Sequence, residues 1–140
     1  MSNGKFVSLH NHTELGSYLD AINDMNQIFE TAKELDMPAL AITEHGNMTS
    51  VYDAYKASKK TGVKFIPGME VYFTEDTNPE NKKNFHLVLL AKNHNGYKNL
   101  LRINHESYKY QVNGYMGKKT NRISWETLQK FNEDVFALTA

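Results

Sequence analysis

Short apolar segments that favour strands alternate along this chain with amphipathic segments that favour helices, and this alternation constrains the fold most. The strand candidates are residues 5–10, 39–43, 63–74, 85–92 and 134–140. The helix candidates are residues 24–37, 49–61, 97–110 and a short stretch after Ser124. Such alternation is typical of α/β folds with a parallel sheet or barrel. In these folds the chemistry lies beyond the carboxyl ends of strands.

Capping and breaking residues set the expected element boundaries. Asp24 is a predicted N-cap, Pro38 ends the helix that follows it, and Gly62 is a predicted C-terminal cap. The Pro67-Gly68 pair is expected to interrupt its strand. Residues 75–84 and 112–121 are polar or rich in glycine and lysine and are expected to be loops.

Length and composition exclude several classes of protein. A chain of 140 residues fits one domain and is too short for a complete template-directed polymerase. It has no cysteine, which excludes disulfides and thiolate metal ligands within these residues. No apolar run approaches about 18 residues, and the start lacks the apolar stretch of a signal peptide. A cytoplasmic protein that does not meet a membrane is the expectation.

The net charge of zero conceals an uneven distribution. Residues 1–80 carry 12 acidic and 6 basic side chains, whereas residues 81–140 carry 4 acidic and 10 basic ones. One interpretation is that these charges form complementary, solvated surfaces. The other is that the acidic first half attracts cations and the basic second half contacts phosphate groups.

Two histidines, His10 and His12, flank Asn11 at the end of the first predicted strand. Residues two apart on an extended segment point the same way, so both imidazoles can bind one metal ion. A lone His-x-His triplet is a weak signal, and surface or core histidines are the alternative reading.

Further possible ligands recur near successive strand candidates. They are Asp20, Glu44, His45, Glu70 and His86. Imidazoles and carboxylates together suit zinc, manganese or iron, and their number suggests more than one ion. Clustered divalent ions favour phosphoester hydrolysis. The alternatives are that Asp20 caps a turn and that Glu44 orients a neighbouring histidine instead of binding metal.

Several segments together are similar to one known family. FVSLHNHTE, MPALAITEHGNM, VKFIPGMEVY, FHLVLLAKNHNGYKNLLRI and VFALTA resemble the polymerase and histidinol phosphatase (PHP) domain at the start of bacterial DNA polymerase III alpha subunits. The AKNHNGYKNLL segment indicates the polymerase branch, because it belongs to no metal site. The resemblance implies a distorted (β/α)7 barrel, which residues 1–140 would form only in part, as the N-terminal portion of a single, incomplete domain.

The resemblance also implies a set of metal ligands, and this sequence differs from the family motifs at two positions near them. Matched one by one to the family motifs, the metal ligands are His10, His12, Asp20, His45, Glu70 as a bridging carboxylate, and His86. Ala21 stands where glycine is usual, and Glu44 replaces an aspartate. The assignment of His86 depends on resemblance alone. A complete domain would hold up to three divalent ions.

The function implied is part of a replicative polymerase, with 3′–5′ exonuclease or other phosphoesterase activity in the completed domain. The partners implied are the rest of the polymerase polypeptide, DNA through the complete enzyme, and replisome subunits. The catalytic carboxylates for nucleotidyl transfer lie in later domains, so we expect this chain alone to be inactive. The alternatives are a structural module that docks a proofreading subunit and a free-standing phosphatase.

Overall fold

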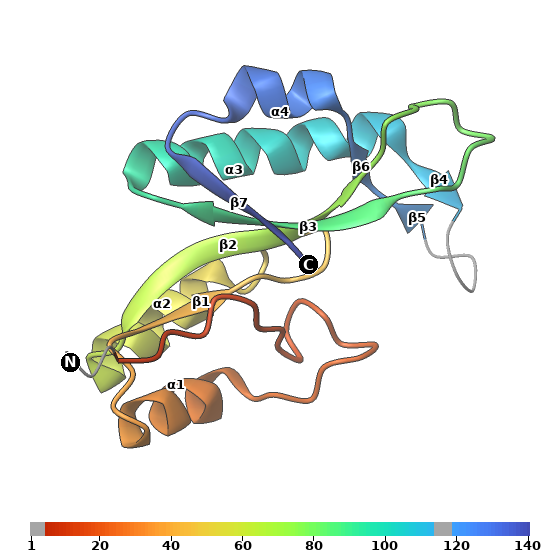
Figure 1. Cartoon of the computed structure of the whole chain (residues 1–140). Coiled ribbons are helices and arrows are strands. Elements are labelled where there is room, and N and C mark those ends of the chain that lie inside the picture. The colour runs from red at the N-terminus through yellow and green to blue at the C-terminus, as the bar shows by residue number, and fades with distance from the viewer. Residues whose placement is uncertain (1–4, 114–118) are drawn as a thin grey trace.

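A mixed β-sheet with helices on one side organises the chain in the computed structural model, which describes residues 5–113 and 119–140 (Figure 1). The main strands follow the order β1 (Ala39–Ile42), β2 (Lys64–Phe73), β3 (Phe85–Ala91) and β7 (Val135–Thr139). The short β6 (Arg122–Ile123) pairs with the end of β2, and β4 (Val112–Asn113) pairs with β5 (Lys119–Thr120) in a separate ladder. The α/β class expected from the alternation is confirmed.

Three of the four described α-helices begin or end at a predicted capping residue, namely Asp24, Gly62 or Ser124. The helices are α1 (Met25–Glu34), α2 (Val51–Thr61), α3 (His94–Ser107), the 3-10 turn η1 (Tyr108–Tyr110) and α4 (Trp125–Phe131). The Asp24 side chain accepts a hydrogen bond from the Gln27 amide, and Ser124 accepts one from the Thr127 amide. Gly62 ends α2 with φ of 81°, a left-handed conformation that glycine adopts without strain.

Strand β2 changes partner in its middle. Its residues Lys64 to Pro67 run parallel to β1, and the residues from Gly68 to Phe73 run antiparallel to β3. The predicted interruption at Pro67-Gly68 was therefore wrong, because the strand continues through this point. A Cβ at Gly68 would lie 2.7 Å from side-chain atoms of both Thr43 and Leu90, so the close approach of the strands requires glycine there.

The expectation of a parallel sheet was only partly right. Strand β2 is parallel to β1 and β6, but β3 is antiparallel to both β2 and β7. The polar connection of residues 74–84 returns the chain directly to the neighbouring position without a helix, which is the connection an antiparallel pair permits.

The segment before α1 lies beside β1 without becoming a strand. The predicted strand at residues 5–10 was wrong, since only one isolated bridge joins Ser8 to Leu40. Two backbone hydrogen bonds still hold the segment extended: the Ala41 amide donates to Ser8 and the Thr43 amide donates to Asn11, both at 2.9 Å. This contact fixes the backbone on either side of His10.

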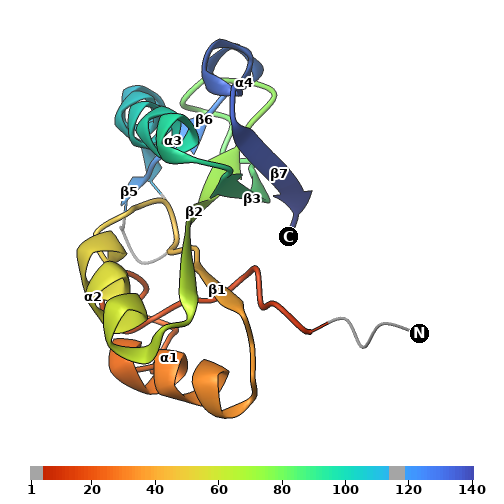
Figure 2. The ribbon, with the colours of Figure 1, turned by 90° about the vertical axis from the view of Figure 1, so that its left-hand side faces the viewer.

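The two faces of the sheet differ. Leu40, Met69 and Leu89 are buried beneath the helices, and α2 and α3 lie on the same side of β2 (Figure 2). The opposite face carries Ala41, Val88 and Leu90. Because side chains alternate along β2, Glu70 points to the face without helices.

The second half of the chain is tied together by Arg122, whose side chain is fully buried. Its guanidinium donates to the backbone carbonyls of Asn78, Asn81 and Tyr110. The predicted loop at residues 112–121 was only partly right, because β4 and β5 lie within it; residues 114–118 lie outside the described residues. Among the described helices, none has the length and apolar character to cross a membrane.

Candidate metal centre

The carboxylate of Glu70 lies at the centre of a cluster of histidines. Its backbone is fixed on both sides: the Glu70 amide donates to the Glu44 carbonyl, the Gly46 amide donates to the Glu70 carbonyl, and Val88 is its cross-strand partner. The side chain is only 2% exposed. A buried carboxylate requires partners that compensate for its lost hydration, and the surrounding imidazoles supply them.

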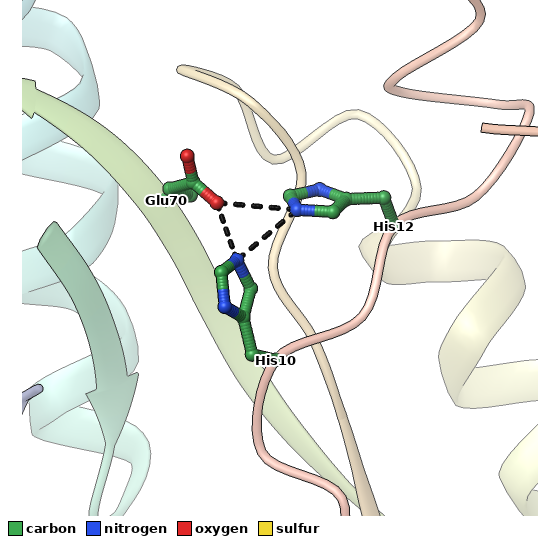
Figure 3. A group of neighbouring side chains, drawn as sticks. All are labelled: His10, His12 and Glu70. Atoms are coloured by element: carbon green, nitrogen blue, oxygen red, sulfur yellow. Dashed lines mark hydrogen bonds and ion pairs between the residues drawn. The ribbon is translucent and has the colours of Figure 1, made fainter. Parts of the chain in front are cut away.

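His10 and His12 approach one oxygen of Glu70 from the extended segment beside β1 (Figure 3). The Nε2 atom of His10 contacts Glu70 Oε2, and the Nε2 atom of His12 lies 3.1 Å from the same oxygen. The two Nε2 atoms are 3.1 Å apart. These three ligand atoms lie within 4.8 Å of one another, a spacing that a single ion can bridge.

His45 and Asp20 extend the cluster on the other side of His12. The imidazole of His45 lies with Nδ1 3.2 Å from Glu70 Oε1 and Nε2 3.1 Å from Asp20 Oδ2. Asp20 is the most exposed member, with its side chain 60% accessible. His45 therefore lies between a buried carboxylate and a solvent-facing one.

His86 reaches the cluster from the start of β3. Its Nδ1 atom lies 2.5 Å from Glu70 Oε1. In the antiparallel register His86 pairs with Tyr72, and residues two apart on β2 share a face, so His86 and Glu70 are diagonal neighbours on one face. The structure thus brings together all six of the residues predicted from the sequence as ligands.

The histidines determine the ionisation of Glu70. Burial alone would raise the pKa of this carboxyl, but the nearby imidazoles of His12, His45 and His10 outweigh it and hold the pKa far below its usual range. Glu70 is therefore an anion at neutral pH, the form in which a carboxylate binds metal.

The donor set fits a cation. Glu70 Oε1 is buried and makes no hydrogen bond of acceptable geometry with any described residue, although two imidazole nitrogens face it. Neutral imidazoles and carboxylates are ligands for zinc, manganese and iron. An ion between these nitrogens and oxygens would satisfy a carboxylate oxygen that the protein itself leaves without a hydrogen bond.

Glu44 lies outside this cluster, and its carboxylate binds the loop that precedes α1. Its carboxylate is 1% exposed and accepts hydrogen bonds from the Thr13 amide, the Thr13 hydroxyl and the Ser17 hydroxyl. A Cβ at Gly16 would lie 2.4 Å from the Glu44 side chain, so the loop packs tightly on it. The partners of this carboxylate among the described residues are Thr13 and Ser17, so the alternative in which Glu44 orients a neighbouring histidine stays a prediction.

Sequence reasoning missed two residues next to the cluster. Ser17 is buried and its hydroxyl lies 3.3 Å from His12 Nδ1. Tyr72 shares the face of Glu70, and its ring centroid lies 5.0 Å from that of His86. Burial, with the negative charges of Glu70 and Asp20, raises the pKa of the Tyr72 phenol, so it stays protonated. Alternation along β2 from Glu70 was the available signal for Tyr72.

A large groove of about 1020 Å³ lies apart from the cluster. It runs between the first turns of α2 and α3 and reaches Pro67 and Phe136, with a mainly apolar lining. The described residues that line it include none of the six predicted ligands. The predicted metal ligands therefore lie outside this groove.

Comparison with protein families and sequences gives one consistent match. The family model described as "PHP domain" matches residues 8–140. DNA polymerase III subunit alpha of Aquifex aeolicus is 38% identical over 96% of this chain, and that of Borreliella burgdorferi is 35% identical over 97%. The Helicobacter pylori protein is 43% identical over 76% of the chain. The chain spans only 9–12% of the length of these relatives.

Two solved structures share the fold. A protein from Bifidobacterium adolescentis, provisionally described as a metal-dependent phosphoesterase, gives a TM-score of 0.52 at 19% identity, covering 75% of this chain and 38% of its own. An amidohydrolase from Chromobacterium violaceum, solved with sulfate and without metal, gives 0.51 at 18% identity, covering 73% and 37%. At these identities the similarity concerns the fold alone.

Proposed function

The chain belongs to the PHP domain family, and on this premise we propose that it binds divalent metal ions at the Glu70 cluster and supports phosphoester hydrolysis within a DNA polymerase III alpha subunit. It is homologous to a small part of such subunits, so the activity, substrates and partners of the whole protein belong to the proposal. The observation that carries the proposal is the convergence of four imidazoles and two carboxylates on one point. Five of these six side chains come from segments of the chain outside β2, which carries Glu70.

Each residue has a proposed part in the centre. Glu70, which faces nitrogens with both of its oxygens, would bridge ions; His10 and His12 would share one of them, and His45 with Asp20 would hold another. His86 would complete the side nearest β3. Bound divalent ions supply Lewis acidity and a deprotonated water at neutral pH. The protonated phenol of Tyr72, beside His86, is a neutral group at the edge of the cluster.

We propose further that residues 1–140 are the N-terminal part of one distorted (β/α)7 barrel. The two structural relatives support this, since each aligns with this chain over less than two fifths of its own length. The metal identity, zinc, manganese or iron, belongs to the proposal as well, as do DNA, replisome subunits and a cytoplasmic location.

Metal titration of the 140-residue protein tests the proposal. Calorimetry with Mn²⁺ and Zn²⁺ should give binding to the wild type that His12→Ala and Glu70→Gln abolish. His105→Ala is the matched control, because His105 is an exposed histidine of α3. Equal binding by all four proteins would contradict the proposed centre.

Hydrolysis is tested separately, on a polymerase alpha subunit that carries this sequence as its PHP domain. Release of nucleotides from a labelled single-stranded oligonucleotide should depend on added metal and should be lost with His12→Ala. Metal binding without any hydrolysis would favour the structural alternative.

A further inference from the structure

Ser17 occupies a position from which it can decide which nitrogen of His12 carries a proton. Its hydroxyl has three neighbours: Glu44 Oε2 at 2.6 Å, His12 Nδ1 at 3.3 Å and the backbone amide of His45 at 3.2 Å. The residue is only 4% exposed, so described protein groups, and not bulk water, surround the hydroxyl.

The hydroxyl proton of Ser17 is committed to Glu44. Three donors converge on that carboxylate, namely the Thr13 amide, the Thr13 hydroxyl and the Ser17 hydroxyl, and this is the arrangement of an ionised acceptor. A hydroxyl has one proton, so Ser17 has none left for its other neighbours. Its oxygen must accept from both of them.

Of those two neighbours, the backbone amide of His45 is always a donor. The remaining neighbour, His12 Nδ1, must therefore carry a hydrogen, since two acceptors facing each other would repel. With a hydrogen on Nδ1, the other nitrogen of His12, Nε2, which lies 3.1 Å from Glu70 Oε2, is the one that can bind a metal ion. The hydrogen bond of Ser17 to Glu44 therefore determines the position of a proton on His12.

We propose that Ser17 is a positioning residue that keeps a hydrogen on Nδ1 of His12 and so leaves Nε2 for a metal ion. The consequence for metal affinity rests on the proposed function; the hydrogen on Nδ1 does not. Hydrogen-bonded partners of this kind fix the ring orientation and tautomer of a ligating histidine, and their loss lowers metal affinity by roughly 10- to 100-fold.

The test is nitrogen-15 NMR of the histidine side chains in the whole 140-residue chain at pH 8, without metal and with Zn²⁺. Wild-type His12 should show a protonated Nδ1 in both states and an unprotonated Nε2 when Zn²⁺ is bound. Ser17→Ala should lose this preference and bind Zn²⁺ about 10- to 100-fold more weakly. Ser50→Ala is the matched control, because Ser50 is also buried and its hydroxyl has no hydrogen-bond partner among the described residues.

The outcomes separate this inference from the proposed function. An unprotonated Nδ1 in wild-type His12 without metal, or an Nδ1 that stays protonated in metal-free Ser17→Ala, overturns the inference even if Zn²⁺ binds. A chain that fails to bind Zn²⁺ but shows the expected hydrogen on Nδ1 leaves the inference standing and contradicts the metal centre. The wild-type spectrum alone decides the tautomer if Ser17→Ala does not fold.

Discussion

The imidazole of His45 stacks on that of His12, with ring centroids 4.0 Å apart and ring planes inclined by 14°. Both rings also face the buried carboxylate of Glu70, so three groups that must share protons or a cation are in direct contact. Two stacked imidazolium rings would repel each other. A divalent cation held by these residues would compensate the carboxylate charge while both rings stay neutral.

Divalent metal should stabilise the folded protein. Because the site exists only in the native state, a metal concentration of 100 times its dissociation constant should add about 2.7 kcal/mol to the free energy of unfolding. Thermal denaturation with Mn²⁺ or Zn²⁺, and then with EDTA, measures the gain and its reversal. His12→Ala should show no gain and His105→Ala the full gain; a gain in His12→Ala would place the ion elsewhere.

Gly16→Ala should damage the loop that carries Ser17. The new Cβ would lie 2.4–2.8 Å from the Glu44 side chain, and overpacking of this kind costs about 1–3 kcal/mol. Both unfolding free energy and Mn²⁺ affinity should fall. Gly62→Ala, where no atom lies within 4 Å but φ is positive, should lower stability alone. Equal Mn²⁺ affinity in Gly16→Ala and Gly62→Ala would show that the loop does not affect metal binding.

Arg122→Met should destabilise the second half of the fold. The substitution leaves the carbonyls of Asn78, Asn81 and Tyr110 without their buried donor, at a cost of about 3 kcal/mol. Urea denaturation measures the loss. Arg102→Met is the control: Arg102 is exposed and, among the residues that the structure describes, donates to Asn99 alone, so the change should be below about 1 kcal/mol.

Asp134 should make stability depend on pH in the acid range. A hydrogen bond from Asn95, then one from Asn93, holds the pKa of this carboxyl below its usual value. The unfolded chain then binds a proton more readily, so the contribution of Asp134 is complete above its unfolded pKa and is lost as the pH falls through the folded pKa.

Asp134→Asn keeps an acceptor and suits the positive φ of 57° at this position, but cannot titrate. The fall in unfolding free energy between pH 5 and pH 3 should therefore be smaller in the variant than in the wild type, as urea denaturation at each pH measures. An identical fall in both proteins would show that Asp134 makes no such contribution.

The helices could be predicted because their signals are local. Asp24 and Ser124 cap helices through their own side chains, and Gly62 ends α2 through its own backbone. The spacing of His10 and His12 likewise predicted two imidazoles on one side of an extended segment. The segment was wrongly expected to be a strand, because strand pairing depends on distant partners and not on its own residues.

The position of His86 could not be derived from strand ends alone. That reasoning assumed parallel strands, whose carboxyl ends meet, whereas His86 stands near the start of β3. The antiparallel direction of β3 brings its start beside the carboxyl-terminal half of β2 and explains the contact with Glu70. The predicted loop at residues 75–84, which is short and has no helix, was the available signal for this direction. Ser17 was missed because its partners Glu44 and His45 lie far along the chain.

The change of partner within β2 has a consequence for how the protein folds. Glu70 meets histidines contributed by chain both before and after it, and 60 residues separate it from His10. Contacts this distant in sequence require the closure of long loops, which form slowly. During refolding, metal binding should therefore occur later than helix formation, when the strands have reached their native arrangement.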